Sequence, residues 1–219
     1  MIYVYAVCDP ETADPVPARR GLGGAALRVA VADGLAALYS RHRTLQPRPS
    51  PQAMWTQERT VRALMDRGAV LPMRFGTQLA DEAALVETLT ARRDELAAGL
   101  DRVRGCVELG LRVVADRLAA PPQAAESGRD YLLERVEEHR GAEQAARDVH
   151  APLARLACES RVRRRTAAPT LFAAAYLVER DAAPAFRAEV ERAAAGLSGV
   201  RAVCTGPWPP YGFVDAEET

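Results

Sequence analysis

The three histidines are the first side chains to weigh, because an imidazole can act as a general base, a general acid or a metal ligand near neutral pH. His139 and His150 lie eleven residues apart in one predicted helix, about three turns, so their rings are too far apart to share a metal ion. His42 lies among arginines in a predicted loop, where we expect it to be solvated. The histidines therefore predict neither a catalytic centre nor a metal site.

The signatures of nucleophilic catalysis and of phosphate binding are also absent from the sequence. It contains no Gly-x-Ser-x-Gly motif, and its four cysteines are scattered without the Cys-x-x-Cys spacing of zinc sites. The glycine-rich stretch Arg20–Gly24 lacks the Lys-Ser/Thr that follows in a phosphate-binding loop, so it predicts a flexible turn. We expect no catalytic residue, no metal and no cofactor.

The segment Ala69–Thr77, which reads Ala-Val-Leu-Pro-Met-Arg-Phe-Gly-Thr, is the strongest remaining candidate for a site. Its apolar run predicts a buried strand that ends in a charge, a ring and a hydroxyl group, and Arg74, Phe75 and Thr77 could contact a partner. Arg74 follows a buried strand and needs an acceptor, which Glu58 in the preceding predicted helix could supply. We favour the structural pairing of Glu58 with Arg74 over a partner contact.

The C-terminal tail is a second candidate surface, because it places Trp208, Tyr211 and Phe213 among three prolines. A proline-rich segment is stiff and loses little entropy when it docks. Tryptophan and tyrosine are also the side chains that anchor many interfaces. The tail could pack on its own domain or present its rings to a partner, and the sequence favours neither.

Composition limits the classes of function. The 219 residues are 48% hydrophobic and 26% charged, with 29 basic and 29 acidic side chains, which does not suggest a general nucleic-acid binder. The residues after Met1 do not form a secretory signal, and no apolar run is long enough to span a bilayer. We expect a cytoplasmic protein that binds neither nucleic acid nor membrane.

The elements that would position the first site lie in the N-terminal half. Asp33-Gly34 predicts the tight turn of a hairpin, and Asp81 predicts the cap of a helix. The apolar positions of the first helix are Met54, Trp55, Val61, Leu64 and Met65. The predicted elements are a strand at Ile2–Cys8, a hairpin at Leu27–Ser40, a helix at Met54–Arg67, a strand at Ala69–Met73 and a helix at Asp81–Leu100. This order predicts a sheet with helices on one face.

The C-terminal half has a different order of predicted elements. They are a strand at Gly105–Val114, a helix at Arg129–Glu159, strands at Arg161–Arg165 and Leu171–Val178, a helix at Pro184–Ala195 and a strand at Val200–Thr205. The order β-α-β-β-α-β is the ferredoxin-like arrangement. We therefore expect an α+β protein with a modified ferredoxin-like unit at residues 1–103 and a ferredoxin-like unit with an extended tail at residues 104–219.

Three segments together resemble the gas vesicle protein F/L family: Ala69–Thr77, Ala175–Val178 and Thr205–Val214. Tyr3–Val7 and Gly105–Glu108 also fit, so the resemblance covers essentially the whole chain in collinear order. It implies two α+β domains, of which the second is ferredoxin-like. The sequence departs from the family in one place, since Gln57-Glu58 stands where the family often has His-Glu. This departure keeps the pairing with Arg74 open and removes a histidine that an enzyme would use.

The resemblance implies a non-enzymatic accessory protein of gas vesicle assembly, located in the cytoplasm and at the vesicle. Members are thought to bind the small hydrophobic shell protein, to keep it from aggregating or to help nucleate the shell, and some are minor vesicle components. Other accessory proteins are further expected partners, and the oligomeric state is left open. The alternative hypothesis is a small-molecule-binding or catalytic α+β enzyme with a site near Arg74.

Overall fold

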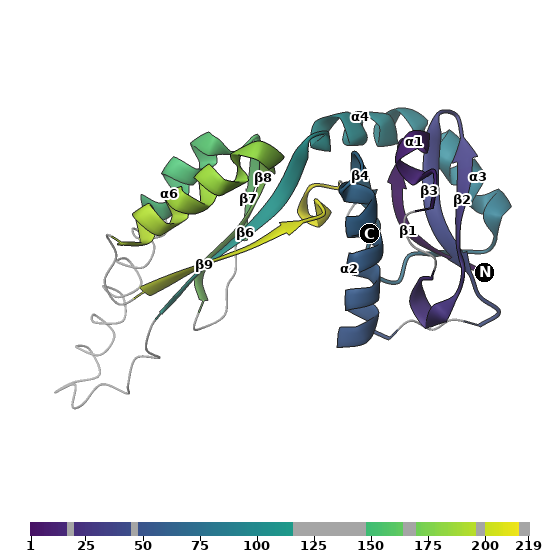
Figure 1. Ribbon diagram of the computed structural model, residues 1–219, viewed down its shortest axis with the longest axis horizontal. Coiled ribbons are helices and arrows are strands. Elements are labelled where there is room, and N and C mark those ends of the chain that lie inside the picture. The colour runs from purple at the N-terminus through teal and green to yellow at the C-terminus, as the bar shows by residue number, and fades with distance from the viewer. Residues whose placement is uncertain (17–19, 45–47, 116–147, 164–169, 196–199, 215–219) are drawn as a thin grey trace, which may run out of the picture. The chain divides into compact units, whose positions relative to one another are not determined.

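The computed structural model describes residues 1–16, 20–44, 48–115, 148–163, 170–195 and 200–214. It is an α+β protein, as predicted, and it contains two antiparallel sheets (Figure 1). Contacts divide the chain into two compact units, the first formed by Met1–Cys106 with the segment from Trp208, and the second by Val107–Pro207. The predicted domain boundary between residues 103 and 104 stays a prediction.

The sheet of the first unit is built around its first strand. Its strands are β1 (Ile2–Cys8), β2 (Leu27–Ala32), β3 (Leu35–Arg41), β4 (Val70–Pro72) and β5 (Gln78–Leu79). The order is β2-β3-β1-β4, and β5 also pairs with β1. The predicted hairpin is β2–β3, and its turn residues Asp33 and Gly34 have φ values of 48° and 79°. Both values are positive, as a type I′ turn requires.

Helices α2 (Pro51–Met65), α3 (Glu82–Ala91) and α4 (Arg93–Val103) complete the first unit, with the short α1 (Pro10–Ala13) and η1 (Leu22–Gly24). Ser50 caps α2, because its side chain accepts a hydrogen bond from the backbone N–H of Ala53. The predicted helix Asp81–Leu100 is in fact two helices. They meet at Arg92, whose φ of −108° and ψ of 18° end the regular helix.

Helices cover both faces of this sheet, which corrects the prediction of a single covered face. All seven residues of β1 are buried, and successive side chains of a strand point to opposite faces. On one face, Gln57 of α2 hydrogen-bonds with Tyr3 of β1, and on the other, Gly99 of α4 lies against Leu71 of β4. Figure 1 shows the sheet between α2 and α3. The continuous apolar run of β1 is typical of a strand buried on both faces.

The second unit contains β6 (Cys106–Ala115), β7 (Glu159–Val162), β8 (Thr170–Glu179), β9 (Val200–Trp208), η2 (Arg180–Ala182) and α6 (Ala183–Ala195), and η3 (Tyr211–Phe213) follows in the tail. The order of the strands is β7-β8-β6-β9, and β7 pairs with β8 antiparallel. Residues 148–156 are helical. They belong to the predicted helix Arg129–Glu159, whose remaining N-terminal part, His139 included, lies outside the described residues.

One apolar cluster forms the core of the second unit. Alternate residues of β6 and β8 enter it, and residues of two helices pack on them, so both helices lie on the same face of the sheet (Figure 1). Its members include Leu109, Leu111, Val113, Phe172, Ala174, Tyr176 and Val178 from the strands, and Val149, Leu153, Phe186 and Val190 from the helices. No helix in the described part of the chain is both long and apolar enough to cross a membrane.

Candidate functional site

The Ala69–Thr77 segment is β4 followed by a loop, and its backbone is bonded to β1 at both ends of the loop. Met73 N donates to the carbonyl of Tyr5 at 2.8 Å, and the carbonyl of Thr77 accepts from Val4 N at 3.1 Å. Two adjacent residues of β1, Val4 and Tyr5, therefore hold the two ends of the loop against the central strand of the sheet. This agrees with the predicted strand and adds the partner that fixes its end.

A buried pair of side chains, Tyr3 and Gln57, holds the middle of this loop. Tyr3 OH donates to Gln57 Oε1 and accepts from Gly76 N at 3.0 Å, and Gln57 Nε2 donates to the carbonyl of Met73 at 2.8 Å. Burial raises the pKa of Tyr3 to about 12, although the Gly76 N–H opposes the shift. Tyr3 thus stays a neutral donor at physiological pH, and α2 is joined to the loop through Gln57.

The hydroxyl group of Thr77, which the sequence suggested as a partner contact, is hydrogen-bonded within the turn. Thr77 Oγ1 and Thr77 N donate to the carbonyl of Arg74 at 2.8 and 3.1 Å. Gly76 has a φ of 95°, which a residue with a side chain rarely adopts. The ring of Phe75 meets the ring of Tyr3 edge-on at 6.1 Å between centroids. Phe75 is half-buried and Arg74 is exposed, so Arg74 is the part of this turn that most faces solvent.

The predicted pairing of Glu58 with Arg74 is not formed in the structure. Glu58 Oε1 instead accepts from Arg62 Nε at 2.5 Å, one turn further along α2. A partner four residues away on the same helix is reached without ordering a separate loop, which explains why it is preferred. Arg74 does not need the carboxylate because its guanidinium is exposed to water.

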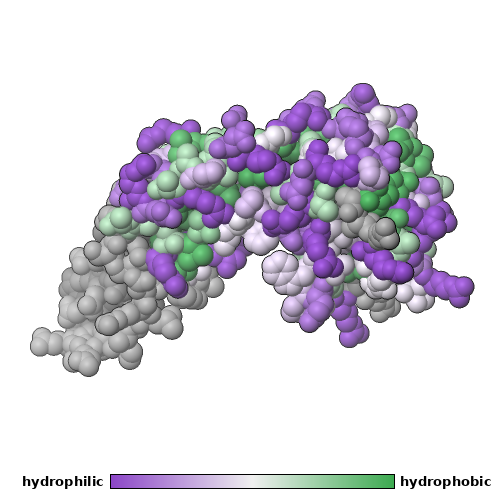
Figure 2. Space-filling view, viewed as in Figure 1, coloured by the Kyte–Doolittle hydropathy of each residue, from purple (hydrophilic) through white to green (hydrophobic). Residues whose placement is uncertain are grey.

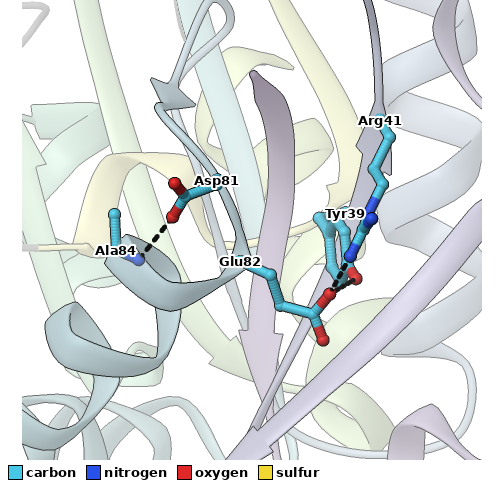
Figure 3. Close-up of polar contacts among 5 residues, drawn as sticks. All are labelled: Tyr39, Arg41, Asp81, Glu82 and Ala84. Carbon is cyan, nitrogen blue, oxygen red and sulfur yellow. Dashed lines mark hydrogen bonds and ion pairs between the residues drawn. The ribbon is translucent and has the colours of Figure 1, made fainter.

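The segment ends where α3 begins, and a second polar cluster fixes that point (Figure 3). Asp81 Oδ1 accepts from Ala84 N at 3.0 Å, which confirms the predicted cap. The neighbouring carboxylate of Glu82 accepts from Tyr39 OH at 2.6 Å and from Arg41 Nη2, both on β3 (Figure 3). The Tyr39 and Arg41 hydrogen bonds lower the pKa of Glu82. The start of α3 is therefore tied to β3 as well as capped.

The C-terminal tail packs on the first unit of its own chain. The Arg62 guanidinium lies over the ring of Trp208, 5.3 Å from its centroid, and Arg102 Nη2 donates to the carbonyl of Phe213. The side chain of Phe213 is fully buried, whereas Trp208 and Tyr211 are half-buried. Trp208 and Tyr211 therefore retain exposed surface for a partner, while Phe213 acts as part of the core. The role of the three rings in partner binding stays a prediction.

The exposed side of α2 was missed by sequence reasoning. Met54 and Trp55 fit the predicted apolar stripe of the helix, but they are 48% and 63% exposed, whereas Val61 and Leu64 are buried. Successive helix residues are turned by about 100°, so Trp55 points well away from the stripe that Val61 and Leu64 define. That angular offset is the signal in the sequence that could have separated Trp55 from the core positions.

The two described histidines are structural. His42 Nε2 lies 2.8 Å from Ser40 Oγ, which in turn lies 2.9 Å from Tyr5 OH, and His150 Nδ1 lies 2.8 Å from Tyr176 OH. Burial lowers the pKa of both histidines. His42 is half-buried rather than solvated as predicted, and Ser40 is fully buried, so a substrate could not reach its hydroxyl.

An open surface hollow is lined by Asp33 and residues 90–95, where α3 meets α4. Its lining is charged, but it contains neither Arg74 nor Glu58 nor a histidine. The structure therefore places the hollow away from the residues that the enzyme hypothesis would use. The polar groups around Arg74 hold the loop in place, while Arg74, Phe75, Trp208, Tyr211 and the exposed side of α2 keep surface open to solvent.

Comparison with known proteins agrees with the resemblance found in the sequence. Residues 1–215 match the family described as gas vesicle synthesis protein GvpL/GvpF. The chain is 30% identical to gas vesicle protein L of a Streptomyces species, over 99% of this chain and 93% of that protein. It is 27% identical to gas vesicle protein F2 of Halobacterium salinarum, over 98% of this chain and 92% of that protein.

Solved structures show the same fold. The crystal structure of the gas vesicle protein GvpF from Anabaena sp. PCC7120 aligns with a TM-score of 0.85 at 18% identity, covering 99% of this chain and 97% of that one. The structure of GvpF from Microcystis aeruginosa aligns with a TM-score of 0.78 at 18% identity, covering 98% and 99%. On the sequence match over residues 1–215, the chain belongs to the gas vesicle synthesis protein GvpL/GvpF family.

Proposed function

We propose that the chain is a non-enzymatic assembly factor of gas vesicles that binds the small hydrophobic shell protein. In this function it keeps the shell protein from aggregating or helps to nucleate the shell, in the cytoplasm and at the vesicle, where it can remain as a minor component. Its other partners are further gas vesicle accessory proteins. The observation that carries the proposal is the family match over residues 1–215.

The arrangement of side chains supports binding better than catalysis. Around Arg74, the polar groups of Tyr3, Gln57 and Thr77 already form hydrogen bonds that hold the loop. Exposed apolar side chains, by contrast, lie on α2 of the same unit. A subunit with a large apolar surface aggregates in water unless a binder covers it, and such a binder needs apolar area of its own with a polar rim.

The alternative, an enzyme with a site near Arg74, gains no support from these contacts. It requires Arg74, Glu58 and a histidine around one pocket. Glu58 bonds to Arg62, His42 lies against Ser40, and Arg74 faces solvent. We therefore propose Arg74 and Phe75 as secondary partner contacts, with no catalytic role.

We further infer that the second unit is ferredoxin-like. The strand order β7-β8-β6-β9, with a helix between β6 and β7 and another between β8 and β9 on one face, supports this inference. The description of the first unit as modified ferredoxin-like stays a prediction, since its order β2-β3-β1-β4 has helices on both faces.

Co-expression tests the proposed function. The shell protein of the same vesicle system is expressed alone, with this chain, and with an unrelated protein of similar size. We expect this chain to raise the soluble fraction of the shell protein several-fold and to be recovered with it on an affinity tag. Recovery of the shell protein in the pellet in all three cases, with none bound to the tagged chain, would contradict the proposal.

A further inference from the structure

The outward side of α2 carries a set of side chains that neither the core nor the loop uses. We refer to it as the α2 face, and its members are Met54, Trp55, Glu58, Arg59, Arg62 and Trp208. Trp55, at 63% exposed, and its neighbour Met54, at 48%, put two large apolar side chains in contact with water. Fully burying a tryptophan removes about 150–250 Å² from water, so an exposed one leaves much of that stabilisation unused.

Helical spacing places three of these residues in one strip, and Met54 lies beside its first member, turned by about 100°. Trp55, Arg59 and Arg62 stand at positions i, i+4 and i+7, which lie on one side of a helix over a length of about 10 Å. The far end of the strip is fixed, because Arg62 is held by Glu58 at 2.5 Å and lies over the ring of Trp208 at 5.3 Å. The end with Met54 and Trp55 is open.

Arg59 gives the strip an uncompensated charge. It is exposed, and its side chain makes no hydrogen bond or ion pair with any residue that the structure describes. Glu58 is already paired with Arg62, so the strip as a whole has one positive charge in excess. Tryptophan and arginine are the residues that most often dominate the binding energy of an interface.

No two of the other large exposed apolar side chains among the described residues are adjacent in sequence; they are Met1, Val16, Val31, Val86, Leu156 and Val162. Val31 on β2 is 58% exposed and Val162 on β7 is 45% exposed, but each is a single small side chain. Isolated exposed valines are normal on protein surfaces and mark no site. Among the described residues, the α2 face combines adjacent large apolar side chains with a free cation.

We propose that the α2 face is the docking surface for the shell protein. An apolar segment of the shell protein covers Met54 and Trp55, and a carboxylate beside that segment pairs with Arg59. The surface offers apolar area with one free positive charge, so the segment that fits it is apolar and carries a carboxylate. The proposal rests on the proposed function and adds the binding surface, the kind of segment and the charge that it must carry.

A quantitative pull-down with the co-expressed shell protein tests the surface. The variants are Trp55→Ala and Arg59→Glu, with Val31→Ala and Arg201→Glu as matched controls, since Arg201 is also exposed and makes no described side-chain bond. Circular dichroism and the thermal midpoint check that each variant folds. We expect Trp55→Ala to weaken binding about tenfold or more and Arg59→Glu about threefold to tenfold, with the controls within about twofold of wild type.

The outcomes separate the two proposals. If wild type fails to hold the shell protein, the proposed function is contradicted and the docking surface with it. If wild type binds and folded Trp55→Ala binds equally well, only the docking surface is overturned. A change in the self-association of this chain, measured by analytical ultracentrifugation, with unchanged shell binding would also overturn it, because the α2 face would then bind a second copy.

Discussion

The two units of the chain differ in how their sheets are covered by helices and in which side chains are buried. In the first unit, helices cover both faces of the sheet, and polar side chains such as Tyr3, Ser40 and Gln57 are buried and hydrogen-bonded. In the second, helices pack on one face over an apolar cluster in which Tyr176, bonded to the adjacent His150, is a polar member. Buried polar networks specify a particular arrangement, whereas apolar clusters mainly stabilise.

This difference suggests that the first unit positions the binding surface and that the second unit mainly contributes stability. The polar network of the first unit joins α2 to the 73–77 loop and thereby sets the orientation of the α2 face. The apolar cluster of the second unit contributes stability and fixes no comparable surface in the described residues. Substitutions in the two units should therefore differ both in the size of their effect and in whether they reach binding.

Removing a ring from the apolar cluster should have the largest effect on stability. Phe186 is fully buried and its ring lies 5.0 Å from that of Tyr176, so Phe186→Ala should lower the free energy of unfolding by about 3–5 kcal/mol. Denaturant unfolding with hydrogen exchange would place the loss in the second unit. Phe75→Ala is the matched control and should cost clearly less, since Phe75 is half-buried. Equal losses of unfolding free energy in Phe186→Ala and Phe75→Ala would contradict this role of the apolar cluster.

Removing one hydroxyl from the polar network should have the next largest effect. Tyr3→Phe keeps the ring but leaves Gln57 Oε1 and Gly76 N without their partner, at a cost of about 1–3 kcal/mol. Tyr176→Phe is the matched change in the second unit and removes a bond to His150. Thermal unfolding should rank Tyr3→Phe as the more destabilising. The reverse order would show that the first unit does not depend on its network.

The contact between the tail and α2 should be weaker. A cation–π pair at a partly exposed site contributes about 0.5–1 kcal/mol. A double-mutant cycle with Arg62→Met and Trp208→Leu should therefore give a coupling energy of about that size in unfolding experiments. A coupling of zero would mean that the cation–π contact does not hold the tail, and that contacts such as the burial of Phe213 and its hydrogen bond with Arg102 do.

Acidification should have the smallest effect, and both units should contribute to it. Burial lowers the pKa of His42 and of His150 below the ordinary value of 6.5. Between that value and the lowered pKa, the unfolded chain binds more protons than the folded one, so stability falls as the pH drops below about 6.5. Urea unfolding from pH 7.5 to 5.5 should show this slope. His150→Gln should flatten it in part, and an unchanged slope would exclude His150 as a cause.

Much of the fold could be predicted because its signals are local. The Asp33-Gly34 turn, the Asp81 cap and the alternation from Gly105 to Val114 each depend on residues close in sequence, and the structure has a turn, a cap and a strand there. The break between α3 and α4 at Arg92 contains no proline or glycine, so helix propensity did not predict it. The covering of the second face of the first unit's sheet depends on how α3 and α4 pack against it, and local sequence signals do not encode such tertiary contacts.

The candidate site was predicted less completely, because its contacts join distant parts of the chain. Tyr3 and Gln57 are 54 residues apart, and Tyr3 and Gly76 are 73 apart, so no spacing rule could pair them. Glu58 was assigned to Arg74 when the local partner Arg62 was nearer. Trp55 was counted among the apolar positions of the first helix, but it is 63% exposed.

Site-specific photo-crosslinking is the most direct test of the division between the units. A benzophenone amino acid replaces Trp55 in one variant and Val162 in another, since both side chains are exposed and they belong to different units. Each variant is co-expressed with the shell protein, illuminated and analysed by mass spectrometry. We predict a shell-protein adduct from position 55 and none above background from position 162. Adducts from position 162 alone would contradict binding through the α2 face.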